Sequence, residues 1–195
     1  MKARILASLD DPALPGMLNN GMIGIIPTDT VYGLVGAVSS QDAIHRMYHI
    51  KERTRQPGTT IAASPTQLIK LGFPASTVTK VAHYWPAALS VEMSATSIPE
   101  YISTGQPVMA ARVPSPENVR KLLEKTGPLM TTSANKPNAP TATNIQAAID
   151  YFGDEVDFYV DVGDLGDRPP STIIGFNDNG ETIVYREGAV SLSQN

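Results

Sequence analysis

Cysteine is absent from this chain of 195 residues, which excludes disulfides, thiolate metal ligands and cysteine nucleophiles. Long apolar runs are absent too, since none approaches the roughly 20 residues that a membrane-spanning helix needs. The first residues reach Asp10 and Asp11 before an apolar segment can develop, so no secretory signal is predicted. Together these absences predict a protein of a reducing compartment, with a cytoplasmic location and no membrane partner.

An excess of positive charge is lacking as well. Fifteen Lys and Arg residues face 19 Asp and Glu residues, which gives a formal net charge of −4. Binding to nucleic acid usually rests on a basic surface, so the overall charge gives no argument for it, although a local basic face stays open. The apolar content of 42% and the charged content of 17% are typical of a folded globular domain.

The two common glycine-rich phosphate motifs are missing. The chain contains neither G-x-x-x-x-G-K-[ST] nor a G-x-G-x-x-G that follows a predicted strand. A bound nucleotide would therefore need cationic side chains and hydroxyls in place of a glycine cradle. The cations available for that role are Lys51, Arg53, Arg55, Arg112 and Arg186.

Predicted strands and helices alternate along the whole chain, but less regularly than in a doubly wound fold. Apolar runs and β-branched residues predict strands at 22–26, 35–38, 59–63, 89–93, 108–113, 129–132, 156–162, 172–176 and 182–186. Amphipathic spacing and capping residues predict helices within 11–21 and at 40–50, 65–71, 77–85, 116–125 and 144–152. We therefore expect an α/β (α+β) fold: one domain over residues 1–195, with a twisted mixed β-sheet flanked by helices and a frayed tail at 191–195.

Polar groups follow several of the predicted strands. The octapeptide Pro27–Leu34 places Thr28, Asp29 and Thr30 after an apolar strand, and Ser133–Ala134–Asn135 follows another. Ligand crevices of open α/β sheets often lie at such strand exits. Read alone, however, either segment is more typical of a capped turn.

Three cations stand at the ends of predicted elements. The helix at 40–50 delivers Lys51 and Arg53 at its C-terminal end, where the helix dipole alone would favour positive charge. Arg112 ends an apolar strand, so it needs an anionic partner or a route to solvent. From the spacing alone, a structural salt bridge is favoured over a bound anion as the partner of Arg112.

Two further patterns resemble metal sites. His45 and His49 are four residues apart on the same predicted helix, but Arg46 stands where H-E-x-x-H requires glutamate. Acidic residues recur irregularly between Asp154 and Asp167, which favours a solvated edge. No metal site is predicted from either pattern.

The ordered set of motifs resembles the YrdC-like family of L-threonylcarbamoyladenylate synthases, over about residues 21–188. The motifs that carry the resemblance are Pro-Thr-Asp-Thr-Val-Tyr-Gly-Leu, Lys51-x-Arg53, Arg112–Val113–Pro114, Thr132–Ser133–Ala134–Asn135, Pro170–Ser171–Thr172 and Arg186. The chain departs from the family pattern at Thr54, at 85–90 and at 136–138. The lack of a sizeable extension after Arg186 resembles the short, single-domain members.

The resemblance implies a nucleotidyltransferase that converts L-threonine, bicarbonate or CO2, and ATP into threonylcarbamoyl-AMP and pyrophosphate, with Mg2+ carried by ATP. A separate transferase complex would then move the threonylcarbamoyl group to tRNA. The implied catalytic set is Lys51, Arg53, Ser133 and Asn135. The implied ATP contacts are Arg53, Ser133, Thr141 and Arg186, and the implied threonine contacts are Thr30, Arg112, Thr131 and Thr172.

Two other functions stay open. Members of this family have been proposed to bind double-stranded RNA or tRNA through a basic concave face, a mode of binding that weakens with salt. Related domains also occur inside carbamoyltransferases, where they belong to longer, multidomain chains.

Overall fold

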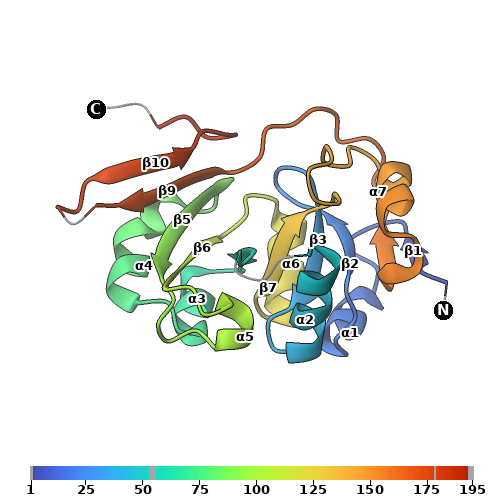
Figure 1. Cartoon of the computed structure of the whole chain (residues 1–195), viewed down its shortest axis with the longest axis horizontal. Coiled ribbons are helices and arrows are strands. Elements are labelled where there is room, and N and C mark those ends of the chain that lie inside the picture. The colour runs from blue at the N-terminus through green and yellow to red at the C-terminus, as the bar shows by residue number, and fades with distance from the viewer. Residues whose placement is uncertain (1, 53–55, 178, 193–195) are drawn as a thin grey trace.

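The computed structural model of the chain describes residues 2–52, 56–177 and 179–192. Within them, ten strands form one sheet in the order β1-β8-β2-β3-β7-β4-β6-β5-β9-β10 (Figure 1). The strands are β1 (Arg4–Leu6), β2 (Gly24–Pro27), β3 (Tyr32–Ala37), β4 (Thr59–Ile61), β5 (Leu89–Ser94), β6 (Val108–Arg112), β7 (Leu129–Ser133), β8 (Phe158–Val160), β9 (Thr172–Phe176) and β10 (Thr182–Arg186). The α-helices are α1 (Leu14–Asn19), α2 (Gln41–Ile50), α3 (Pro65–Leu71), α4 (Ala75–Val81), α5 (Glu100–Ser103), α6 (Glu117–Thr126) and α7 (Ile145–Phe152), and short 3-10 turns follow α4 and α7.

The sheet mixes parallel and antiparallel pairs, as the sequence predicted. The central strands β2, β3, β7 and β4 pair antiparallel, whereas β4 pairs parallel with β6 and β5 pairs parallel with β9. This arrangement confirms one α/β domain with a mixed sheet.

Helices cover both faces of the sheet, and strand β3 shows why. Its side chains alternate between two apolar clusters: Tyr32 and Leu34 belong to one, and Val35 and Ala37 belong to the other. Helices α1 and α6 complete the cluster around Val35, while α2 and α7 contribute to the cluster around Leu34 (Figure 1). A strand buried on both faces reads as a nearly continuous apolar run, which β3 does.

Short polar side chains cap three of the helices. Ser40 accepts a hydrogen bond from the backbone N–H of Ala43 at the start of α2, and Asn144 accepts one from Ala147 at the start of α7. Ser64 caps α3 in the same way. The cap at Ser40 fixes where α2 begins. The helix then runs to Ile50, so Lys51 follows directly at its C-terminal end.

The structure corrects several predicted bounds. Strand β1 was not predicted, because Arg4 and Ile5 are exposed and the strand exists only through its parallel pairing with β8. Strand β3 begins at Tyr32, inside the segment that was read as loop, because it pairs with β2 and β7. Helix α5 was also missed. The helix expected at 77–85 begins at Ala75 and ends in a 3-10 turn, and the strand expected at 156–162 is limited to β8.

Residues 188–190 fold back onto the segment that leads into β9. The backbone N–H of Ala189 donates to the carbonyl of Pro170 at 2.8 Å. The Thr172 hydroxyl donates to the carbonyl of Val190 at 2.6 Å and accepts from its N–H at 3.1 Å. These contacts tie residues 189 and 190 to Pro170 and Thr172, on either side of Ser171.

No helix among the described residues combines the length and the apolar character that crossing a membrane would require.

Candidate active site

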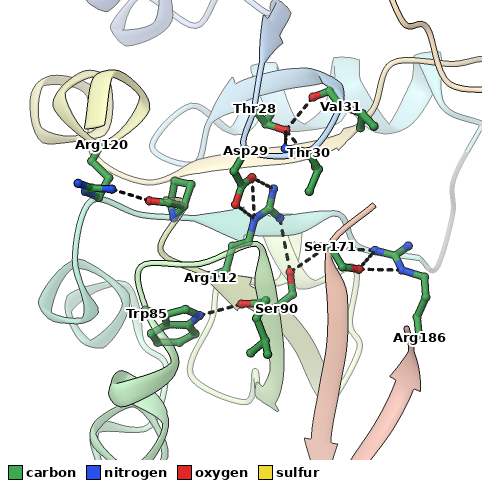
Figure 2. A network of polar contacts seen from close by, with 12 residues as sticks. Thr28, Asp29, Thr30, Val31, Trp85, Ser90, Arg112, Arg120, Ser171 and Arg186 are labelled. Carbon is green, nitrogen blue, oxygen red and sulfur yellow. Dashed lines mark hydrogen bonds and ion pairs between the residues drawn. The ribbon is translucent and has the colours of Figure 1, made fainter. Parts of the chain in front are cut away.

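The turn between β2 and β3 presents its polar side chains in fixed positions. The Thr28 hydroxyl donates to the carbonyl of Val31 at 2.7 Å and accepts from the backbone N–H of Thr30 at 3.3 Å. The backbone N–H of Thr28 also donates to the carbonyl of Val31. Two donors on one carbonyl close the turn, so Asp29 and Thr30 project from a rigid frame (Figure 2).

Asp29 forms an ion pair with Arg112, which ends β6. The shortest N–O distance is 2.7 Å, between Nη2 and Oδ1, and Nε lies 3.1 Å from both carboxylate oxygens. The side chains are 4% and 0% exposed, respectively, for Arg112 and Asp29. The predicted need of Arg112 for an anionic partner is thus met by a residue of the octapeptide.

Two serines continue this polar network to a second arginine. Nη1 of Arg112 lies 3.5 Å from the hydroxyl of Ser90 on β5, and Ser90 donates to the hydroxyl of Ser171 at 3.1 Å. Nη2 of Arg186 on β10 in turn donates to the Ser171 hydroxyl at 3.1 Å and to its carbonyl at 2.8 Å (Figure 2). Partial burial, followed by the positive charge of Arg112, lowers the pKa of Arg186. The two guanidinium groups are therefore held close to each other in one region.

A third cation, Lys51, lies at the C-terminal cap of α2. Its Nζ donates to the carbonyl of Ser133 at 3.0 Å, to the carbonyl of Asn135, and to the Asn135 side-chain oxygen at 2.9 Å. The Ser133 hydroxyl donates to that same Asn135 oxygen at 2.7 Å. Lys51 is 4% exposed, so these oxygens replace much of the water that an ammonium group needs.

A cavity of about 210 Å³ opens between the β2–β3 turn and the two arginines. Residues that line it include Thr30, Val31, Arg112, Thr131, Ser171 and Arg186. Gly33 lies in its wall, where a Cβ atom would come 2.7 Å from the Thr131 hydroxyl and 3.1 Å from the Thr28 methyl group. A side chain at this position would fill the space next to the cavity, so the glycine keeps it open.

Two further cavities adjoin the first at Ser133. One, of about 450 Å³, is lined by Ser133, Arg186 and Thr141, together with residues 165–168. The other, of about 270 Å³, is lined by Ser133, Lys51 and Asn135. Because Ser133 lines all three, the cavities form one branched site with a cation on each branch.

Backbone strain marks the Lys51 branch. Glu52 and Asn138 both line it, and both have left-handed φ angles, of 51° and 63°. Non-glycine residues in that conformation cost free energy and tend to gather at functional sites.

The structure brings together most of the residues that the sequence singled out. Thr30, Arg112 and Thr131 line the first cavity, Thr141 lines the second, and Lys51 and Asn135 line the third. Ser133 and Arg186 lie where cavities meet. Arg53 lies outside the described residues.

Thr172 departs from this pattern. Its hydroxyl is engaged by the backbone of Val190, and Thr172 lines none of the three cavities within the described residues. The neighbouring Ser171 and Ile173 line the first cavity instead. Successive residues of a strand point to opposite sides, so the motif Pro170–Ser171–Thr172 presents Ser171 to the cavity where Thr172 was predicted.

Sequence reasoning missed three contributors: the role of Asp29 as the partner of Arg112, the bridging hydroxyl of Ser90, and the wall formed by residues 165–168. Asp29 could have been found, because it is the acidic residue inside the octapeptide. Ser90 and residues 165–168 carry no distinctive pattern, and only the pairing of β5 with β9 and the course of the loop place them here.

Tyr32 links the octapeptide to that loop. Its hydroxyl donates to the carbonyl of Gly163 at 2.8 Å and accepts from the backbone N–H of Val162 at 3.1 Å. Burial raises the pKa of the Tyr32 hydroxyl, and the hydrogen bond from Val162 opposes that rise. Tyr32 therefore anchors the chain that leads to the wall of the second cavity.

The acidic stretch serves local structure. Asp157 pairs with Arg46 at 2.8 Å and accepts from the backbone N–H of Ile23, and Glu155 pairs with Lys136 at 2.8 Å. Among the residues that the structure describes, no group of three or more His, Asp or Glu side chains is placed to hold a metal ion.

Comparison with known proteins supports a common fold and family. The profile of the Sua5/YciO/YrdC family, which carries the description "Telomere recombination", matches residues 16–188. The threonylcarbamoyl-AMP synthase of Pseudoalteromonas translucida (strain TAC 125) is 31% identical over 163 residues, which cover 80% of this chain and 87% of that protein.

Solved structures share the architecture. Sua5 of P. abyssi, crystallised with L-threonine, superposes with a TM-score of 0.82 at 24% identity, and the match covers 96% of this chain but 58% of that one. This chain thus spans less than two thirds of the P. abyssi protein. YciO of E. coli superposes with a TM-score of 0.80 at 20% identity, over 98% of this chain and 97% of that one. These structural likenesses show the fold.

Proposed function

We propose, because this chain belongs to the Sua5/YciO/YrdC family, that it is a threonylcarbamoyl-AMP synthase. The reaction joins L-threonine, bicarbonate or CO2, and ATP, and it releases pyrophosphate, which makes the enzyme a nucleotidyltransferase. The name of the P. translucida relative and the threonine complex of the P. abyssi protein support this assignment.

The observation that carries the proposal is the branched site that meets at Ser133. An amino acid and a nucleotide must react with each other, so their pockets must share a boundary. The cavity with Thr30 and Arg112 suits an amino acid, and the larger cavity with Thr141 and Arg186 suits a nucleoside. The branch at Lys51 suits the phosphates.

The chemistry has two steps, and the second needs a cation. First, the neutral amine of threonine attacks CO2, or bicarbonate with loss of water, and a carbamate forms as the amine loses a proton. Next, a carbamate oxygen attacks the α-phosphorus of ATP, and the bond to the departing pyrophosphate breaks. Negative charge grows on the phosphoryl oxygens and on the leaving group, so a cation held in place beforehand lowers the barrier.

Lys51 is the residue to which we assign that role. Its ammonium group donates to three neutral oxygens, which hold it in place beside the third cavity. Ser133 and Asn135 contribute by holding Lys51 and by lining the junction. We assign Arg53 to the phosphates on the strength of the family motif alone.

Threonine would lie in the first cavity. Arg112 suits the carboxylate, because a guanidinium offers a planar pair of donors. Thr30 or Thr131 suits the substrate hydroxyl, and a site built to pair with a hydroxyl rejects analogues that lack it. Ser171 replaces Thr172 in this assignment, because Ser171 lines the cavity.

Three further expectations go with the proposal. Mg2+ would arrive with ATP, held mainly by phosphate oxygens and water, as is usual for this ion. The product would pass to a tRNA threonylcarbamoyl transferase complex. Both steps would take place in the cytoplasm.

The placement of the cations favours catalysis over RNA binding as the main function. Lys51 and Arg112 are almost fully buried, so a nucleic-acid backbone could not reach them without rearrangement. Binding to RNA would instead need an exposed basic face.

An assay with labelled bicarbonate tests the proposal. Label should enter an adenylate only when ATP and L-threonine are both present, and Lys51→Ala should abolish the product. Incorporation that needs no threonine, as with carbamoyl phosphate turnover, would contradict the assignment.

A further inference from the structure

Asp29 does not reach the site itself. It lines none of the three cavities within the described residues, and its side chain is fully buried. Its contacts go to Arg112, which does line the first cavity. Any effect of Asp29 on a ligand must therefore act through Arg112.

The geometry of the pair decides which face of Arg112 meets the cavity. A guanidinium carries five N–H bonds, one on Nε and two on each Nη. Asp29 engages Nε and Nη2, and Ser90 lies near Nη1. Within the described residues, this leaves a second N–H on each Nη for a ligand, side by side on the end of the fork. That end matches the two oxygens of a carboxylate.

Asp29 is itself held rigidly. It belongs to the turn that the Thr28 hydroxyl and backbone close on Val31, so the position of its carboxylate is set by that turn as well as by Arg112. A bidentate contact from a fixed carboxylate sets both the position and the rotation of the guanidinium.

From this geometry we infer that Asp29 is a positioning residue, which orients the Nη1–Nη2 end of Arg112 toward the carboxylate of the amino-acid substrate. The inference rests on the proposed function, and it extends that function to a residue that touches no substrate. Asp29 pairs with Arg112 and reaches Arg186 only through two serines, so its replacement should act mainly on the amino-acid branch.

The test compares Asp29→Asn and Asp29→Glu with the unmodified protein. Asn keeps one acceptor oxygen but places an amide N–H₂ against the fork, so Arg112 loses its fixed rotation. The KM for L-threonine should rise about 10- to 100-fold, as is typical when a binding group is displaced by about 1 Å. The KM for ATP and the kcat at saturating threonine should each change by less than about threefold, well short of the tenfold change expected for threonine. Asp29→Glu keeps the charge on a longer stem and should recover part of the lost affinity.

A second measurement separates positioning from a general loss of structure. L-Threoninamide has no carboxylate, so its inhibition constant against threonine should be nearly the same in Asp29→Asn and in the unmodified protein. A merely structural role of Asp29 would weaken threonine, threoninamide and ATP together. Glu117→Gln removes an acidic partner from an exposed pair and serves as the matched control, with all constants unchanged.

The outcomes are distinct. An unchanged or lower threonine KM in both Asp29 variants, with normal activity of the unmodified protein, would overturn the inference and leave the proposed function in place. Absence of any threonine-dependent adenylate from the unmodified protein would instead overturn the proposed function. If Asp29→Asn does not fold, Asp29→Glu alone decides: a selective rise in the threonine KM supports the inference, and equal changes for both substrates contradict it.

Discussion

The two buried cations at opposite branches of the site are held in different ways. Arg112 is paired with a carboxylate, so the formal charges of that pair cancel. Lys51 donates hydrogen bonds to neutral oxygens of Ser133 and Asn135, which orient its ammonium group. The difference separates two tasks that a cation can perform, one of them geometric and the other electrostatic.

This contrast matches what each branch would have to do. An amino-acid carboxylate is a stable anion that must be recognised in one orientation, and a fixed fork provides that. The transferring phosphoryl group gains charge during the reaction, and a cation held in place beside it lowers its energy.

The largest effect should come from breaking the Arg112 pair on one side. Asp29→Ala leaves a buried guanidinium without its carboxylate, which typically costs about 3–5 kcal/mol of unfolding free energy. Asp29→Leu combined with Arg112→Met removes both charges and should be much less destabilising than the single change. Urea denaturation of the single and double variants provides the measurement. Equal losses in both would mean that the pair is not the source of the effect.

Removal of Lys51 should act mainly on the rate. Lys51→Met should raise the barrier of adenylate formation by about 2.7–4 kcal/mol, by analogy with the loss of one oxyanion-hole donor. Steady-state kcat with labelled bicarbonate measures this. Lys136→Met is the matched control, because Lys136 forms a partly exposed pair with Glu155 and lines none of the three cavities within the described residues. A normal kcat for Lys51→Met would show that Lys51 does not stabilise the charge that develops during adenylate formation.

Tyr32→Phe should have a smaller effect on stability and a characteristic dependence on pH. Loss of its hydrogen bonds to Gly163 and Val162 should cost about 0.5–1.5 kcal/mol of unfolding free energy. Because the pKa of Tyr32 is raised above its ordinary value of 10.0, the folded state holds the phenolic proton more tightly than the unfolded state does. Its contribution is therefore fully present below pH 10 and is lost as the pH rises through the folded-state pKa. Denaturation of both proteins between pH 8 and pH 11 checks this, and a constant difference would contradict it.

The smallest effect is expected at the exposed pair of Glu117 and Lys121. Both side chains are largely exposed. The hydrogen bond and positive charge of Lys121 lower the pKa of Glu117, but water surrounds the pair. Glu117→Gln should leave the urea midpoint unchanged within error at neutral pH. A clear shift would show that surface pairs contribute more than the buried-pair comparison assumes.

The sequence predicted the sheet type and most of its elements, because apolar runs and caps are local features. Helix α3 and strands β9 and β10 have the predicted bounds, and short polar residues, Ser40 and Asn144, cap α2 and α7. Strand β1 could not be predicted, since Arg4 and Ile5 are exposed and only the pairing with β8 makes them a strand. Helix α5 is a single short turn, below the length at which periodicity is informative.

The sequence could predict those candidate site residues that stand in the family motifs. Lys51, Ser133 and Asn135 converge as the family motifs implied, and Arg112 and Arg186 line one cavity. What the motifs could not provide was direction: the strand geometry sends Ser171 into the cavity and Thr172 away from it. The partnership of Asp29 with Arg112 joins residues 83 positions apart, and only the folded chain brings them together.

The return of residues 188–190 to the start of β9 has a practical consequence for anyone who shortens or redesigns this protein. At Gly188, a Cβ atom would stand 2.2 Å from the carbonyl oxygen of Pro170, so any side chain there must push the two segments apart. The segment that would move carries Ser171, and with it the anchor of Arg186. A substitution at Gly188, beyond the last strand, would thus disturb the cavities that Arg186 lines.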